Sequence, residues 1–188
     1  MAKSAYAKSG VNLEASNHLK SGLRKMLGGA SRPEVLGKVG GFGGLFAFKP
    51  KKYKQPILVS SVDGVGTKLK VAFAMNRHHT IGQDLVNHCV DDIAVLGAKP
   101  LFFLDYLGTG ELKPNVFEKI IAGFVQGCAE NNCALIGGET AQMPGFYQKG
   151  EYDVSGTIVG VVDKAKMLDG RGIKPGDAVI GIASSGLH

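Results

Sequence analysis

Short apolar runs alternate with longer amphipathic stretches along most of the chain. Strands are predicted where β-branched and other apolar residues gather, at 56–62, 101–107, 134–136, 152–162 and 177–183. Helices are predicted at 80–97 and 114–131. The order, roughly β-α-β-α-β-β, is typical of an α+β or split βαβ fold, in which helices cover one face of a sheet. The other face must then pack against something else, such as a partner chain.

The helix predicted at 80–97 has the clearest boundaries in the sequence. Thr80 followed by Gln83 matches a capping box, in which two side chains satisfy backbone donors at the start of a helix. Gly97 and Pro100 are typical of a helix end.

One carboxylate of this helix falls on its apolar side. At about 100° per residue, a single arc holds Ile81, Leu85, Cys89, Ile93 and Leu96. The opposite side holds Asp84, Asn87 and Asp91, of which the two aspartates are expected to face solvent. Asp92 projects inside the apolar arc, where a carboxylate is unfavourable unless it is paired, hydrogen-bonded or bound to a metal. A carboxylate that caps a neighbouring loop is the alternative.

The segment Asp63-Gly-Val-Gly-Thr-Lys68 directly follows a predicted strand. It lacks the spacing of a P-loop. The carboxylate of Asp63 could hold Mg²⁺, which prefers hard oxygen ligands, and the ammonium of Lys68 could neutralise phosphate. The glycines would let backbone N–H groups face the same anion. An ordinary Asp-Gly turn between strands is the alternative.

Two further segments are rich in glycine. Glu139 stands beside Gly137 and Gly138, just past the strand predicted at 134–136, where a ligand crevice is common in layered α/β folds. The run 37–44 (GKVGGFGG) could fold over a nucleotide. Each of these segments could equally be a plain surface loop.

The histidines give no separate signal. His78, His79 and His88 show no convincing metal-ligand spacing with cysteine or carboxylate, so we expect ordinary structural roles for them.

Composition narrows the class of protein. The chain has 188 residues, of which 44% are hydrophobic and 20% charged, as in a folded domain with its own core. The net charge of +6 favours anionic partners such as phosphates. The basic residues are scattered and the aromatic residues form no stacking series, so nucleic acid is not expected as a partner. Three cysteines without metal-ligand spacing, no signal peptide and no membrane-spanning run indicate a cytoplasmic protein.

Several long motifs in order resemble the phosphoribosylformylglycinamidine cyclo-ligase (aminoimidazole ribonucleotide synthetase) family. They are SGVNLEASN (9–17), RPEVLGKVGGFGGLF (32–46), SSVDGVGTKLK (60–70), TIGQDLVNHCVDDIAVLGAKPLFFLDYLGTGEL (80–112), LIGGETAQMPGFY (135–147), YDVSGTIVGVVDK (152–164) and SSGLH (184–188). The resemblance extends over nearly the whole chain and is far more specific than any single glycine pattern.

The resemblance implies an ATP-binding N-terminal domain that forms a homodimer with a barrel-like core. The family uses ATP and Mg²⁺ to cyclise formylglycinamidine ribonucleotide to aminoimidazole ribonucleotide. By motif match, the implied catalytic residues are Lys68, Asp92, Glu139 and His188. The implied nucleotide-binding residues are Gly40, Gly41, Gly43, Gly44, Asp63, Gly64, Gly66, Thr67, Lys68 and Asn87. The implied metal ligands are Asp63, Asp92 and Asp105.

The resemblance also divides the chain. We expect an N-terminal extension at 1–36, the ATP-binding domain at 37–170 and the start of a second domain at 171–188. Family members continue beyond His188, so we expect this chain to be inactive alone. It departs from the family at Asp91, where Asn is usual, and at Gln142, where Glu is usual.

Two alternative functions stay open at this stage. Selenophosphate synthetase, thiamine-monophosphate kinase and a hydrogenase maturation protein belong to the same superfamily. A dimerisation domain without catalysis would retain only the shape.

Overall fold

The computed structural model describes residues 26–37 and 41–186 and contains one four-stranded mixed sheet. The strands are β1 (Pro56–Gly64), β2 (Lys99–Thr109), β3 (Ala134–Gln142) and β4 (Tyr152–Asp163), in the order β1-β4-β2-β3. β4 runs antiparallel to both of its neighbours, whereas β2 and β3 are parallel. The predicted residues Gly40 and His188, and most of the extension at 1–36, lie outside the described residues.

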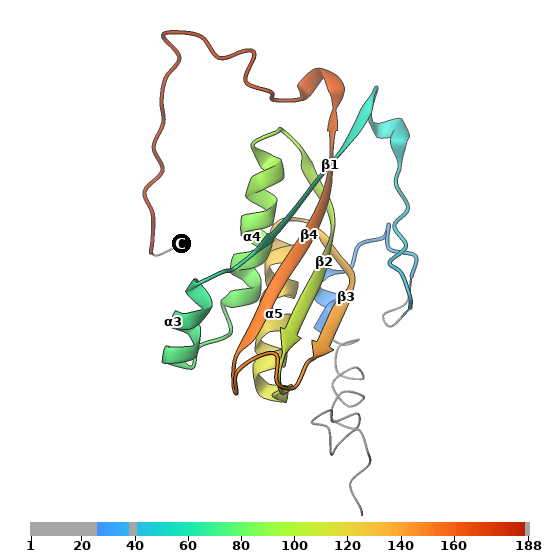
Figure 1. The fold of residues 1–188 in the computed structure, drawn as a ribbon. Helices are drawn as coiled ribbons and strands as arrows, with labels where there is room; N and C mark the ends of the chain where they lie inside the picture. The colour runs from blue at the N-terminus through green and yellow to red at the C-terminus, as the bar shows by residue number, and fades with distance from the viewer. Residues whose placement is uncertain (1–25, 38–40, 187–188) are drawn as a thin grey trace, which may run out of the picture.

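Three α-helices accompany the sheet in the described residues: α3 (Lys68–Met75), α4 (Ile81–Ala94) and α5 (Pro114–Glu130). Short 3₁₀ turns lie at Gly28–Ala30, Pro50–Lys52 and Lys164–Lys166. Figure 1 shows α4 and α5 behind the sheet, on one face. The predicted α+β fold, with its β-α-β-α-β-β order and helices on one face, is confirmed.

The core lies between this sheet face and the two long helices. Alternate residues of β4 are buried, as a half-covered strand requires. The side chains that fill the layer include Phe103, Leu107, Val154 and Ile158 from the sheet and Leu85, Ile93, Ile120 and Phe124 from the helices. Leu58 and Val62 of β1 are exposed on the opposite, helix-free face.

Glycine lets α4 and α5 approach closely. A Cβ atom on Gly82 would lie 2.2 Å from the carbonyl oxygen of Ile120 and 2.4 Å from the backbone nitrogen of Phe124. A Cβ on Gly123 would in turn lie 3.0 Å from the Cα of Gly82. The two backbones therefore touch at this crossing, which fixes the distance between α4 and α5.

The C-terminal strand prediction was wrong. Residues 177–183 form no strand, and Val179, Ile180 and Ile182 are almost fully exposed. The segment lies apart from the sheet and passes alongside the domain (Figure 1). A β-propensity pattern yields a strand only where another strand accepts its hydrogen bonds, and the described part of the chain supplies none here.

Three local expectations also need correction. β3 continues to Gln142, so the Gly-Gly-Glu segment lies inside a strand and not in a loop after it. Thr80 precedes α4, but its side chain makes no capping hydrogen bond. The helix α3 was not predicted, because its eight residues carry almost no amphipathic pattern.

Among the described residues, no helix combines the length and the apolar character that a membrane span requires.

Candidate functional site

Asp63, His88 and Asp92 converge between β1 and α4. The Nε2 atom of His88 lies 2.5 Å from Oδ2 of Asp63. One ligand atom from each of the three side chains lies within 4.8 Å of the others. All three residues are partly buried, so the cluster is open to solvent on one side.

Local geometry explains why these residues meet. Ser61 and Asp63 are two positions apart on β1 and therefore point to the same, helix-covered face. His88 and Asp92 are four positions apart on α4, and so lie one above the other. The Ser61 hydroxyl donates a hydrogen bond of 2.6 Å to Oδ2 of Asp92. The backbone N–H of Gly64 donates one of 2.7 Å to Oδ1 of Asp63.

The core-side position predicted for Asp92 agrees with this placement. Its carboxylate accepts a hydrogen bond from Ser61, which is one of the conditions under which a carboxylate is tolerated on the apolar side of a helix. Cys89, beside the cluster, is fully buried, and burial raises the pKa of its thiol to about 12, so the sulfur stays protonated.

The side chain of Lys68, the first residue of α3, lies close to this cluster. Its Nζ is 2.5 Å from Oδ2 of Asp84, one helical turn before His88 on α4. The expectation that Asp84 faces solvent was wrong, since its side chain is only 25% exposed and pairs with this lysine. Lys68, at the start of α3, reaches this edge of α4, and a helix wheel drawn for α4 alone does not include that contact. Asp91, by contrast, is exposed as expected.

Asn87 is turned away from the carboxylates. Its Oδ1 accepts a hydrogen bond of 2.7 Å from Nδ2 of Asn131, at the end of α5. The amide therefore links α4 to α5. A nucleotide-binding role for Asn87 would require it to leave this partner.

Asp105 lies on the same sheet face but two strands away. Asp63, Gly156 and Asp105 are in register across β1, β4 and β2, which separates the two carboxylates by about 10 Å at the backbone. The candidate metal group found in the described residues does not include Asp105. Burial raises the pKa of Asp105 to about 7, with a hydrogen bond from its own backbone N–H acting in the opposite direction.

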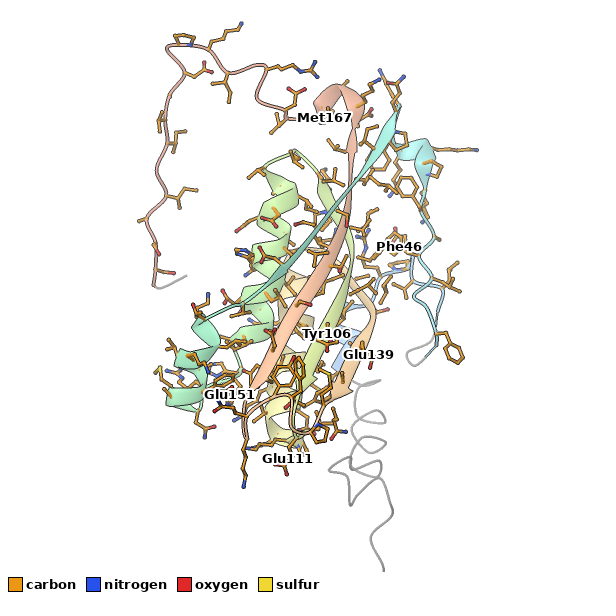
Figure 2. The ribbon with its side chains drawn as sticks, in the orientation of Figure 1. Phe46, Tyr106, Glu111, Glu139, Glu151 and Met167 are labelled. Atoms are coloured by element: carbon orange, nitrogen blue, oxygen red, sulfur yellow. The ribbon has the colours of Figure 1, made fainter. Side chains whose placement is uncertain are left out.

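Glu139 lies on the opposite face of the sheet. It is in register with Tyr106, whose neighbours Asp105 and Leu107 point toward the helices, so Tyr106 and Glu139 share the helix-free face. Figure 2 labels both side chains, on adjacent strands. Glu139 is exposed and does not join Asp63 and Asp92 within this chain.

The described glycines of the 37–44 run also lie apart from the cluster. A Cβ on Gly44 would lie 2.7 Å from Cδ1 of Ile136 on β3, and the following Phe46 ring contacts Phe102 on β2. Figure 2 shows Phe46 on this side of the sheet. β3 and β1 form opposite edges of the sheet, so Gly41, Gly43 and Gly44 do not adjoin Asp63.

His88 was missed by the sequence analysis. The pattern that would have found it is the four-residue spacing between His88 and Asp92, which places an imidazole and a carboxylate on one helix face. Spacing alone could not show that Asp63 would approach from another element.

Comparison with known proteins adds to this geometry. A family model described as AIR synthase related protein, N-terminal domain, matches residues 50–162. The chain belongs to this family.

Curated relatives of this AIR synthase related chain carry a consistent name. Proteins named phosphoribosylformylglycinamidine cyclo-ligase from Anaeromyxobacter sp. (strain Fw109-5) and Myxococcus xanthus (strain DK1622) are each 55% identical over 183 residues, or 97% of this chain. One from Syntrophotalea carbinolica is 54% identical over 186 residues, or 99% of this chain. The chain covers 53% of each of them, and so spans about half their length.

Solved structures agree on the fold. A thiamine-monophosphate kinase from Stenotrophomonas maltophilia K279a has a TM-score of 0.61 at 23% identity, covering 78% of this chain and 42% of that one. A hydrogenase maturation protein HypE in complex with ATP has a TM-score of 0.58 at 17% identity, covering 85% of this chain and 44% of that one. At these identities the likeness shows a shared fold.

Proposed function

We propose that this chain forms the ATP-binding half of an enzyme that cyclises formylglycinamidine ribonucleotide to aminoimidazole ribonucleotide. The observation that carries the proposal is the convergence of Asp63 and Asp92 on one site. It occurs in a chain that is 55% identical, over 97% of its length, to proteins named phosphoribosylformylglycinamidine cyclo-ligase.

The residues fit a divalent cation and a triphosphate. Asp63 and Asp92 offer the hard oxygen atoms that Mg²⁺ prefers, and both carboxylates are already oriented by hydrogen bonds. When bound, the cation would neutralise phosphate charge. Lys68 would add a second positive charge at the same edge, after exchanging part of its contact with Asp84.

The proposed reaction needs positioning more than it needs a nucleophile from the protein. ATP transfers its γ-phosphoryl group to the formyl oxygen, an amidine nitrogen attacks the activated carbon, and phosphate leaves with that oxygen. The products are aminoimidazole ribonucleotide, ADP and phosphate. Phosphorylation converts a poor leaving oxygen into a good one, so the protein contributes alignment and charge neutralisation. Support for a nucleotide comes from the HypE structure, which is a complex with ATP.

The positions of the exposed apolar surface and of the candidate site residues within one chain favour a homodimer. Leu58 and Val62 leave apolar surface on the helix-free face of an edge strand, which a second copy would cover. Glu139 lies on that helix-free face. The glycines at 41–44 lie near β3, at the opposite edge of the sheet from Asp63. We propose that a second copy brings its own glycine loop and Glu139 toward the site. His188 and a C-terminal half would then complete the binding site for the ribonucleotide.

We also propose a cytoplasmic location. All three cysteines are buried free thiols, which is common in a reducing compartment.

The test of the metal–nucleotide site is calorimetric titration of the purified chain with ATP in the presence of Mg²⁺. Asp92→Asn should weaken binding on the order of tenfold or more, as expected when a metal ligand is lost. Asp91→Asn is the matched control, because Asp91 is the adjacent carboxylate and is exposed. Equal affinities for the two variants would refute the assignment of Asp92.

Activity is tested by measuring ADP and aminoimidazole ribonucleotide formation. We expect none from this chain alone, and turnover after addition of a polypeptide that corresponds to the remaining length of the relatives. Full turnover by the chain alone would show that the site is complete within these residues.

A further inference from the structure

We propose that His88 is a third, nitrogen ligand of the cation site formed by Asp63 and Asp92, and that this site therefore favours Mn²⁺ and similar transition-metal ions over Mg²⁺. The inference rests on the proposed function only in taking Asp63 and Asp92 as metal ligands. It adds a donor that the motif comparison did not assign.

The positions of the three side chains suit one ion. Donor atoms that each lie about 2.1 Å from a shared octahedral ion are separated by about 3 Å when adjacent and about 4.2 Å when opposite. The ligand atoms of Asp63, His88 and Asp92 all lie within 4.8 Å of one another, so small side-chain rotations bring them to these separations. The contact between Asp63 and His88, at 2.5 Å, would open slightly as the ion takes the place of this hydrogen bond.

Neighbouring groups hold these ligands in place. Ser61 donates to Asp92, and the backbone of Gly64 donates to Asp63, which orients both carboxylates from outside the ligand shell. His88 is carried by α4, which packs closely against α5 at Gly82 and against β4 at Gly160, where a Cβ would lie 2.5 Å from Cδ1 of Ile93. The side chains of His88 and Asp63 are 34% and 40% exposed, so an ion can reach them from solvent.

The donor set determines which ion is preferred. Imidazole nitrogen suits the transition metals, whereas Mg²⁺ takes oxygen ligands and keeps several waters. Two carboxylates and one imidazole should therefore bind Mn²⁺ more tightly than Mg²⁺. Removing the imidazole should abolish most of that preference while leaving Mg²⁺ binding nearly unchanged.

Pulsed electron paramagnetic resonance of Mn²⁺ bound to the purified chain tests the ligand directly. Without nucleotide present, we expect ¹⁴N modulation from a coordinated imidazole. The modulation should disappear in His88→Gln and persist in His79→Gln, a control that removes an exposed imidazole on the preceding loop. Far-ultraviolet circular dichroism of both variants verifies that they remain folded.

Several outcomes would overturn the proposal. These are Mn²⁺ bound without ¹⁴N modulation, modulation that survives in folded His88→Gln, and no Mn²⁺ binding by the wild-type chain. The first result would leave His88 as a hydrogen-bond partner of Asp63 only.

A second measurement on the same samples separates this inference from the proposed function. After ATP is added, Mn²⁺ at the site should broaden the ³¹P resonances of the nucleotide. Broadening without prior ¹⁴N modulation would refute the role of His88 and leave the nucleotide site standing. Modulation without broadening would support His88 as a ligand and count against the ATP site.

Discussion

Gly138 lies so close to Asp105 that a Cβ atom on this glycine would be 2.3 Å from Oδ1 of the aspartate. The two residues are paired across β3 and β2. Gly156 lies opposite Asp105 on the other neighbouring strand, and a Cβ there would be 2.0 Å from the ring of Phe103. Gly138 therefore leaves room for the partly buried carboxylate of Asp105, and Gly156 leaves room for the ring of Phe103.

Replacement of Gly138 by alanine should destabilise the protein. The new methyl group would lie 2.3 Å from both the backbone carbonyl oxygen and Oδ1 of Asp105, so these groups must shift. We therefore expect a loss of about 1–3 kcal/mol in the free energy of unfolding. Gly137→Ala is the matched control, because its Cβ would lie 3.6 Å from Leu104, an ordinary contact. Equal urea midpoints for the two variants would contradict this account.

Asp105 should make stability depend on pH. Its pKa in the folded protein, about 7, is above the ordinary value of 3.8. Below pH 3.8 both states hold the proton; as pH rises toward 7 only the unfolded chain releases it, so the folded state loses stability, and above 7 the loss is constant. Between pH 5 and pH 7 this amounts to about 2–3 kcal/mol.

The variant Asp105→Asn isolates this effect, because it keeps the shape and removes the titration. Its stability relative to the wild type should rise between pH 5 and pH 7 and then level off, measured by urea unfolding with a chelator present. A difference that stays constant with pH would show that Asp105 titrates normally.

The crossing of α4 and α5 should tolerate no side chain at Gly82. A methyl group would lie 2.2 Å from the Ile120 carbonyl oxygen, so the helices must separate, at a loss of about 3 kcal/mol. Gly28→Ala is the comparison, since a Cβ at that position meets nothing within 4 Å. Thermal unfolding should place Gly82→Ala well below both Gly28→Ala and the wild type.

The proposed homodimer should depend on the helix-free face. Val62→Arg introduces a charge there, and we expect sedimentation velocity to show a monomer where the wild type is a dimer. Val95→Arg is the control, because Val95 is 71% exposed just after α4 and lies away from that face. A wild-type chain that stays monomeric at micromolar concentration would refute the dimer itself.

The sequence alone determined much of the element order. The amphipathic pattern of α5 predicted its bounds to within a residue, since Pro114 can begin a helix and the apolar spacing continues to Glu130. The run of β-branched residues predicted β4 equally well. These signals are local, because each depends only on residues within one element. Asp92 was identified for the same reason, as a polar residue that interrupts an apolar helix face.

Only the tertiary structure decided which side chains meet. His88 and Asp84 had no clear role until β1 and α3 approached α4, because the sequence does not state which element lies on which side of a helix. Glu139 and Asp105 belong to motifs of the same family, yet strand register places them on opposite faces of the sheet. The segment at 177–183 shows the converse case, in which strand-forming residues stay extended and exposed. A strand is completed by hydrogen bonds to a neighbour, and that neighbour is a property of the fold and not of the segment.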